Sequence, residues 1–241
     1  MTDFNQQTQD NLIRTLLNLP ASRTVFTKSQ RAYADVRKAI VTHSLPANTP
    51  LDESFLLSLF PVGRTPLREA LKRLAHEGLL VWTSHQAPTV RDVSMHEMQY
   101  LYETRRMLEP AIAVMAAQRA TPQDIASIQS YSDDMVDASQ TGDVYRSVES
   151  DFALHAAIAR STQNRFLAEA STALNLQSLR LWYRNQTTHG IKSIHETHTE
   201  LVDAIFSRDT TRAESLARAH IQSSLNRQTT ALNEFKFLDS D

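Results

Sequence analysis

Glycine is scarce in this chain, and its scarcity limits the fold more than any other feature of the sequence. Only four glycines occur in 241 residues, at positions 63, 78, 142 and 190. Folds built from strands and tight turns need many glycines, because such turns require a positive φ that other residues avoid. Helices tolerate few glycines and favour Ala, Leu, Gln and Arg, which are frequent here. The sequence therefore predicts a mainly α-helical protein.

The composition also excludes several classes of protein. Cysteine is absent, so disulfides, thiolate nucleophiles and cysteine-ligated zinc sites are excluded. No apolar run reaches about 18 residues, so we expect no membrane-spanning helix. The first thirty residues lack a basic start followed by an apolar core, so we expect no secretory signal and a cytoplasmic location.

From residue 94 onward the sequence shows only helical patterns. Capping boxes, in which a Ser or Thr is followed three residues later by an acid, open the first two helices at Ser94 and Thr121. We predict that residues 94–237 form an all-α antiparallel bundle. The expected helices cover 94–119, 121–139, 143–160, 165 to about 185, 191–208 and 210–237.

The front of the chain has a different order of elements. Residues 1–28 form an N-terminal extension, and its amphipathic stretch 4–19 is compatible with a docked helix or a frayed tail. Helices are expected over 29–44 and 53–60, the second with Asp52 as its N-cap.

A third helix is expected to start with Thr65 as its cap and Pro66 at its first position, and to stop at Gly78. Two short β-type runs follow it and suggest a hairpin. Three helices and a hairpin are the order of a winged helix-turn-helix, which we predict over residues 29–93.

The third helix has a basic polar face opposite an apolar stripe that starts at Leu67. Arg68 and Lys72 lie on this face and Arg64 precedes it; Arg suits bidentate contact with guanine, and Lys suits phosphate. The whole chain has a net charge of -2, but residues 1–94 carry 11 Lys and Arg against 8 Asp and Glu. The pattern leaves open an ordinary solvated helix, in which Glu69 and Arg73 form an i,i+4 ion pair.

Residues 29–94 resemble the DNA-binding domain of the GntR family of bacterial transcription regulators. The match is strongest over the run RTPLREAL, which starts at Arg64, and over residues 74–79. The resemblance implies that Arg64, Thr65 and Arg68 contact double-stranded operator DNA, with Lys72 as a phosphate contact.

The chain departs from the family pattern at three places. Gly63 stands where the family has Ser, Ser54 where it often has a DNA-contacting Arg, and Gln86-Ala87 where the wing tip often reads Arg-Gly. We therefore expect the operator to differ from the common one.

The C-terminal half contains a buried acid and inward-facing histidines. Asp151 and His155 are four residues apart, hence neighbours on one apolar helix face, and His198 and His220 each share a stripe with apolar residues. Three imidazoles and a carboxylate suit a divalent transition metal with room for a further ligand. Each residue also has a plainer interpretation. The histidines are compatible with hydrogen-bonded core residues, Asp151 with an ion pair to Arg105 or Arg180, and spacing does not separate His198 from His189 or His195.

Residues 94–236 resemble the all-helical effector domain, called FCD, of FadR-type GntR regulators. DFALH supplies Asp151 and His155, THTELVDAI supplies His198, and DTTRAESLARAHI supplies His220. The resemblance implies a metal site of these four residues, with zinc expected first and nickel or manganese as alternatives. It also implies a homodimer that senses a small carboxylate, with Arg105 as its counter-charge.

Together these features predict a ligand-responsive bacterial transcription regulator that represses metabolic genes until a small organic acid binds near the metal. We expect no enzymatic activity. The alternatives are a metal-dependent hydrolase that uses the Asp and His cluster, and a purely structural metal that stiffens the helical domain.

Overall fold

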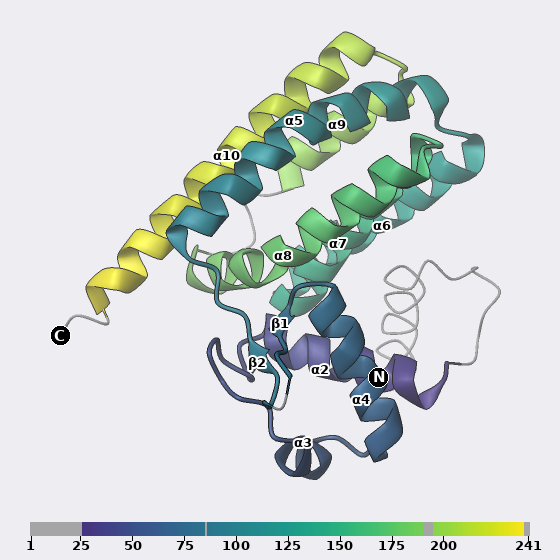
Figure 1. Cartoon of the computed structure of the whole chain (residues 1–241). Helices are drawn as coiled ribbons and strands as arrows, with labels where there is room; N and C mark the ends of the chain where they lie inside the picture. Colours follow the sequence, from purple (N-terminus) through teal and green to yellow (C-terminus); the bar gives the residue numbers. More distant parts are fainter. Residues whose placement is uncertain (1–25, 85, 190–194, 239–241) are drawn as a thin grey trace. The chain divides into compact units, whose positions relative to one another are not determined.

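The computed structural model describes residues 26–84, 86–189 and 195–238, and the expected amphipathic stretch 4–19 lies outside them. The chain divides between Asp92 and Val93 into two compact units, each of which is described by itself. The first unit contains α2 (Lys28–Val41), α3 (Glu53–Leu59), α4 (Arg64–His76), β1 (Leu80–Val81) and β2 (Thr89–Val90) (Figure 1).

The first unit is built around α2 and α4, whose apolar faces pack together. Tyr33, Val36 and Ile40 of α2 are buried, as the sequence predicts. The stripe on α4, which starts at Leu67 and ends at Leu74, is buried as well. Asp52 caps α3 by accepting the backbone N–H groups of the next turn, which confirms its expected role.

The start of α4 differs from the expectation. Gly63, not Thr65, is the N-cap, and no side chain accepts the free N–H groups there. Thr65 and Pro66 therefore lie inside the first turn. The end is as expected: Gly78 has a φ of 78°, its N–H donates to Ala75 O, and the next N–H donates to Leu74 O. This is the Schellman arrangement, which glycine allows at no steric cost.

The hairpin is short and antiparallel, with Leu80 opposite Val90 and Val81 opposite Thr89. Pro50, which precedes α3, forms an isolated antiparallel β-bridge with Thr89 and so links the segment before α3 to the hairpin. Leu80 and Val90 are buried under the helices, so the hairpin closes the core of the unit. The order and packing are those of a winged helix-turn-helix.

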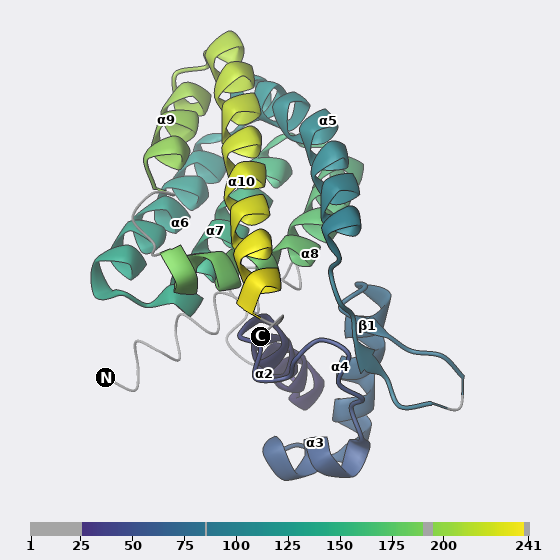
Figure 2. The ribbon, with the colours of Figure 1, turned by 90° about the vertical axis from the view of Figure 1, so that its left-hand side faces the viewer.

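The second unit is entirely helical in its described part (Figure 2). The capping boxes expected at Ser94 and Thr121 are both present, and Gly142 ends a helix with a φ of 72°. The unit contains α5 (Met95–Arg119), α6 (Pro122–Thr141), α7 (Val144–Ser161), α8 (Arg165–His189), α9 (His195–Phe206) and α10 (Thr210–Leu238).

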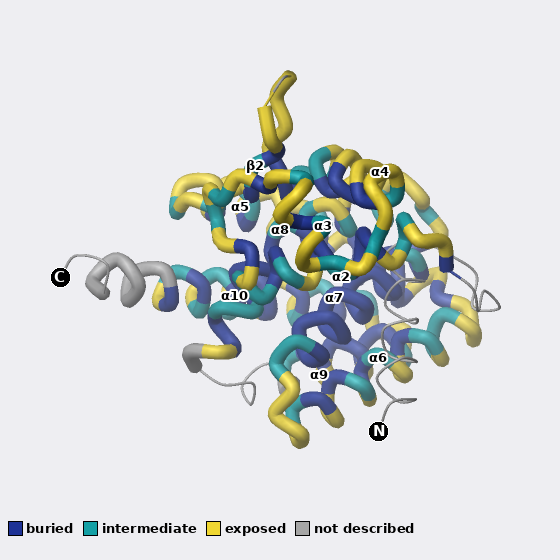
Figure 3. Tube along the Cα trace, turned by 90° about the horizontal axis from the view of Figure 1, so that it is seen from below, coloured by how far each residue is buried: buried dark blue, intermediate teal, exposed yellow. Residues whose placement is uncertain are grey.

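The helix α7 is the centre of this unit. It packs against α5, α6 and α8, and nearly every residue from Arg146 to Ser161 is buried, whichever way its side chain points (Figure 3). The sequence predicts only one inward face for this helix. The rest is buried because most of its residues are small or apolar, and neighbouring helices cover them on every side.

The long helices α5 and α10 lie side by side (Figures 1 and 2). Two apolar clusters lie along them, one containing Ile112 and Ala217, the other Tyr102 and Ile221. The polar residues of α5 between Tyr102 and Ile112, and of α10 between Ala217 and Ile221, therefore lie where the two apolar clusters meet.

The fold class predicted from the sequence is confirmed: a winged helix-turn-helix is followed by an all-helical unit. The helix α8 extends four residues beyond its expected end at residue 185. Residues 191–194, the start of the expected fifth helix, lie outside the described part. None of the described helices is both long enough and apolar enough to span a membrane.

Candidate DNA interface and candidate metal centre

The basic face of α4 is open to solvent. Arg64, Thr65, Arg68 and Lys72 are all exposed, and the buried stripe of the same helix anchors it to the unit. The structure thus places the four residues predicted to contact DNA on one accessible face, at the helix that enters the major groove in winged helix-turn-helix proteins.

One acid from a neighbouring helix reaches this face. Glu53, in the first turn of α3, accepts a hydrogen bond from Arg68 Nε at 2.6 Å, and its other oxygen lies 3.8 Å from Arg64 Nε. Sequence reasoning missed this contact because Glu53 is on another helix, 15 residues before Arg68, and no local spacing relates the two.

Arg73 has a different role from its basic neighbours. Its expected ion pair with Glu69 is not formed; instead its Nε lies 2.7 Å from Glu77 Oε1. The Arg73 guanidinium also lies over the ring of Tyr33, whose hydroxyl donates to Glu77 at 2.7 Å. Arg73 pairs with Glu77 rather than with Glu69 because the hydroxyl of buried Tyr33 holds the Glu77 carboxylate in place, whereas Glu69 is exposed to solvent.

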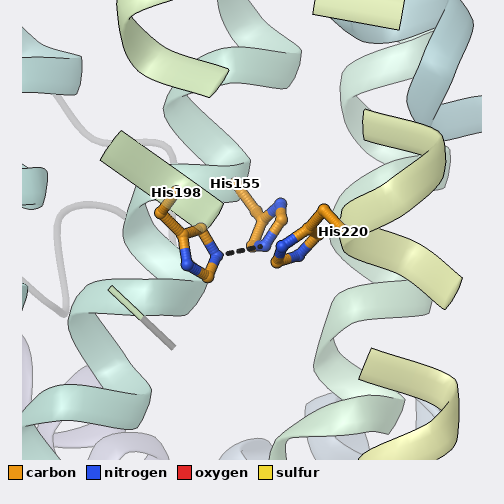
Figure 4. A group of neighbouring side chains, drawn as sticks. All are labelled: His155, His198 and His220. Atoms are coloured by element: carbon orange, nitrogen blue, oxygen red, sulfur yellow. Dashed lines mark hydrogen bonds between the residues drawn. The ribbon is translucent and has the colours of Figure 1, made fainter. Parts of the chain in front are cut away.

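Three helices bring the predicted metal ligands together. Asp151 and His155 come from α7, His198 from α9 and His220 from α10, and all four are buried. Figure 4 shows the three imidazoles converging, and their nearest ligand atoms all lie within 4.8 Å of one another. The side chains of His189 and His195, the alternatives to His198, lie outside the described part of the chain.

The separations suit ligands that share one ion. His155 Nε2 lies 3.3 Å from His198 Nε2, and Asp151 Oδ1 lies 2.9 Å from His198 Nε2 and 3.4 Å from His155 Nε2. Ligands about 2.0–2.1 Å from a common ion are about 2.9–3.4 Å apart at octahedral or tetrahedral angles. Asp151, His155 and His198 therefore have the spacing of ligands that share one ion, and His220 lies beside them.

The chemistry of the cluster also fits a cation. Asp151 Oδ1 is buried and makes no hydrogen bond of acceptable geometry, and an orphaned anionic oxygen is costly in a protein interior. Asp151 Oδ1 lies within 3.4 Å of a ring nitrogen of each of the two histidines and forms no ion pair with Arg105 or Arg180. A divalent ion would satisfy this oxygen and the lone pairs of the imidazoles together.

The titration behaviour of the cluster is consistent with ligation. Burial opposes ionisation of Asp151, but His198 and His155 outweigh it and hold the pKa of the carboxyl well below its usual range. Burial, together with the charges of His198 and His155, holds the pKa of His220 well below its ordinary value. Metal ligation needs an ionised carboxylate and neutral imidazoles, and these are the forms favoured for Asp151 and His220.

The predicted effector residue Arg105 is fully buried beside the cluster. Its Nε lies 2.6 Å from Glu109 Oε1, whose other oxygen is 4.0 Å from His155 Nδ1. Its guanidinium lies over the rings of Tyr102 and Trp182, and Nη2 has no hydrogen-bond partner. Arg105 therefore holds a buried positive charge next to the cluster, most of it already matched by Glu109.

A small cavity of about 10 Å³ adjoins the cluster. It is large enough for an ion or a single water, and smaller than any organic acid. Sequence reasoning missed its α10 wall, although the signal is visible as polar residues that follow His220 at helical spacing. The lining residues are Asp151, Trp182, His198, His220, Ser224, Arg227 and Gln228.

A basic recognition helix on a winged helix-turn-helix, joined to a separate helical unit, defines a class of two-unit DNA-binding proteins. Comparison with known families agrees. A model of the FCD domain matches residues 100–223, more than half of the chain, and a model of bacterial regulatory proteins of the gntR family matches residues 28–90. The chain belongs to the GntR family of transcription regulators, in the group that carries an FCD domain.

Curated relatives are transcription regulators as well. The chain is 28% identical over 188 residues to the Nta operon transcriptional regulator of Aminobacter aminovorans, covering 76% of this chain and 86% of that protein. It is 27% identical over 224 residues to the galactonate operon transcriptional repressor of Escherichia coli (strain K12), covering 83% and 96%. Family and relatives are regulators of transcription, so the chain is not an enzyme.

Solved structures share the fold. The E. coli McbR/YncC structure aligns with a TM-score of 0.73 at 20% identity, covering 86% of this chain and 99% of that chain. A GntR regulator from Rhodococcus sp. RHA1 aligns with a TM-score of 0.70 at 18% identity. At these identities the likeness concerns the fold alone.

Proposed function

We propose that this regulator is a homodimer that binds operator DNA through Arg64, Thr65, Arg68 and Lys72 and represses genes for the use of a small carboxylate. Several relatives are named as repressors of metabolic operons, which supports the direction of control. Members of the family typically bind operators as dimers, and a two-fold operator matches two recognition helices.

The observation that carries the sensing role is the cluster of Asp151, His155, His198 and His220. We propose that it holds a divalent transition metal; zinc is the first candidate, with nickel and manganese next, because imidazole and carboxylate suit all three. With Asp151, His155, His198 and His220 as its ligands, such an ion would have room for the effector's carboxylate as a further ligand.

The counter-charge for the effector comes from Arg105 and Arg227. Arg227 lines the cavity, and Asp151 acts on its charge. Because the cavity holds no more than a small ion or a water, an organic acid enters only if α8, α9 and α10 rearrange around it. Such a rearrangement gives the ligand different affinities for two states, which is the requirement for a switch.

Metal analysis of the purified full-length protein tests the site. Asp151→Ala and His220→Ala are expected to lose most of the bound metal, and the surface variant Glu103→Ala to keep it. Wild-type metal content in both cluster variants would rule the site out.

DNA release tests the switch. Fluorescence anisotropy on a duplex selected by the full chain from a randomised library is expected to show release when the correct carboxylate is added to metal-loaded protein. Failure of the chain to select any sequence would contradict the regulatory function itself.

A further inference from the structure

The contact between Glu53 and the recognition helix is not explained by folding stability. Glu53 is half-buried, with 27% of its side chain exposed, whereas the Arg68 side chain is 64% exposed. Ion pairs with so much solvent around them contribute little to folding stability. At the same time a carboxylate beside Arg64 and Arg68 subtracts from the attraction of this face for a polyanion.

The geometry of the Glu53–Arg68 pair leaves the two terminal nitrogens of the Arg68 guanidinium available for DNA. Glu53 takes the single Nε–H of the guanidinium, so the two terminal nitrogens remain to donate together. Those two nitrogens form the fork that matches guanine O6 and N7 in the major groove. A long flexible arginine loses conformational entropy when it binds, and a partner that already fixes its direction reduces this loss.

No other side chain in the described part of α3 offers a similar contact to α4. Ser54 Oγ donates to Asp52 Oδ1, and that aspartate is occupied in capping α3. The acidic group of α3 that faces the recognition helix is therefore the Glu53 carboxylate, and it lies within ion-pair distance of both arginines predicted to contact DNA.

We propose that Glu53 is a positioning and specificity residue of the DNA interface. It aims Arg68 end-on at one base pair and, through its charge, weakens binding to DNA of the wrong sequence. Discrimination between operator and other DNA thus rises at the cost of overall affinity. The inference rests on the proposed role of Arg68 as a DNA contact.

Three variants of the full-length protein separate the positioning effect from the charge effect. Glu53→Ala removes both, Glu53→Gln removes the charge and keeps an oxygen that accepts from Arg68 Nε, and Glu69→Ala removes an exposed acid of α4 that lies next to Arg68 in sequence. Each is measured on the library-selected duplex and on a scrambled duplex of equal length, from about 50 to 200 mM salt. Circular dichroism and melting confirm that each variant is folded.

We expect Glu53→Ala to tighten binding to the scrambled duplex and to lower the ratio of specific to non-specific affinity about tenfold, the size of one lost base contact. In Glu53→Ala the slope of log affinity against log salt concentration becomes steeper by up to about one released counterion. Glu53→Gln is expected to tighten non-specific binding similarly but to retain more of the ratio. A ratio in Glu53→Ala equal to that of Glu69→Ala would overturn the proposal, as would a Glu53→Gln ratio as low as that of Glu53→Ala.

Library selection with each variant shows whether Glu53 acts through Arg68 or contacts DNA directly. If Glu53 acts through Arg68, then Glu53→Ala and Arg68→Ala relax the preference at the same base pair and leave the other positions unchanged. Relaxation at a different base pair means that Glu53 contacts DNA directly, and this overturns the positioning role. If Arg68→Ala relaxes no position, the assignment of Arg68 fails, a result distinguishable from failure of Glu53 alone.

Discussion

At the scale of single residues, the proposed metal site should depend on groups beyond its four ligands. Glu109 Oε2 lies 4.0 Å from His155 Nδ1, the ring nitrogen opposite the converging Nε2 atom. A carboxylate behind a ligating histidine orients the ring and raises its basicity, and removing such a partner typically lowers metal affinity about 10–100-fold.

We therefore predict that Glu109→Gln weakens metal binding by about 10–100-fold, measured by competition with a chelator. Glu103→Gln, on the exposed side of the same helix, is the control and should bind as wild type. Because Glu109→Gln leaves the Arg105 charge buried and unmatched, the double variant Arg105→Gln, Glu109→Gln is measured beside it. Wild-type affinity in both Glu109 variants would contradict the role of this carboxylate.

Tyr33 gives a pH dependence that belongs to the first unit. Burial and the hydrogen bond to Glu77 raise its pKa above the ordinary value of 10.0, so the folded state keeps the phenol neutral where the unfolded chain ionises. The stabilisation is complete below pH 10 and is lost as pH rises above it, by up to about 1.4 kcal/mol per pH unit.

The variant Tyr33→Phe should lose about 1 kcal/mol near neutral pH, the value of one hydrogen bond, but should lack this alkaline loss. Urea unfolding at several pH values from 8 to about 11, followed by the fluorescence of Trp82 in a Trp182→Phe background, checks both statements for the first unit. Parallel alkaline curves for the two proteins would show that Tyr33 is not responsible.

At the scale of elements, substitutions at Gly142 and Gly63 should change stability in opposite directions. Gly142 has a φ of 72°, and a Cβ there would meet nothing within 4 Å, so Gly142→Ala should cost about 1 kcal/mol through backbone strain alone. Gly63 is an N-cap with a φ of -83° and room for a side chain, so Gly63→Ser should stabilise α4 by a few tenths of a kcal/mol. Urea unfolding measures both, and equal signs would refute the comparison.

Local sequence rules predicted the elements that depend on local contacts. The capping boxes at Ser94 and Thr121, the cap at Asp52 and the stop at Gly78 all involve residues a few positions apart, and each is present. The start of α4 was wrong by about two residues, because Gly63 caps without a side chain and leaves no polar signature in the sequence.

The sites were predictable only in part, for a related reason. Helical spacing and family resemblance point to Asp151, His155, His198 and His220, and the structure brings them together. The contacts of Glu53 with α4, and of Arg227 with the cavity, arise between helices distant in sequence. No periodicity along the chain records such pairs, so they become visible only in three dimensions.

At the scale of the whole molecule, the response to the effector should require that the metal is already bound. Removing the metal with a chelator is expected to lower the melting temperature, since an ion present at about 1,000 times its dissociation constant stabilises the folded state by about 4 kcal/mol. The metal-free protein should still bind operator DNA but no longer release it when the carboxylate is added. Both properties are measured on one preparation, by thermal unfolding and by anisotropy.

A purely structural metal gives a different result: the melting temperature falls, but the response to the carboxylate persists. Sedimentation of the same samples reports whether the proposed dimer survives loss of the ion.

The central position of α7 has a mechanical consequence. A helix with no solvent-facing side cannot turn or slide by small amounts, because every displacement forces close-packed neighbours to change their side-chain positions together. Asp151 and His155 belong to this helix. A displacement of a fraction of an ångström at the cluster therefore either leaves the helix in place or moves it in one step against α5, α6 and α8. We therefore expect the interior of this unit to change between discrete packing arrangements rather than to deform gradually.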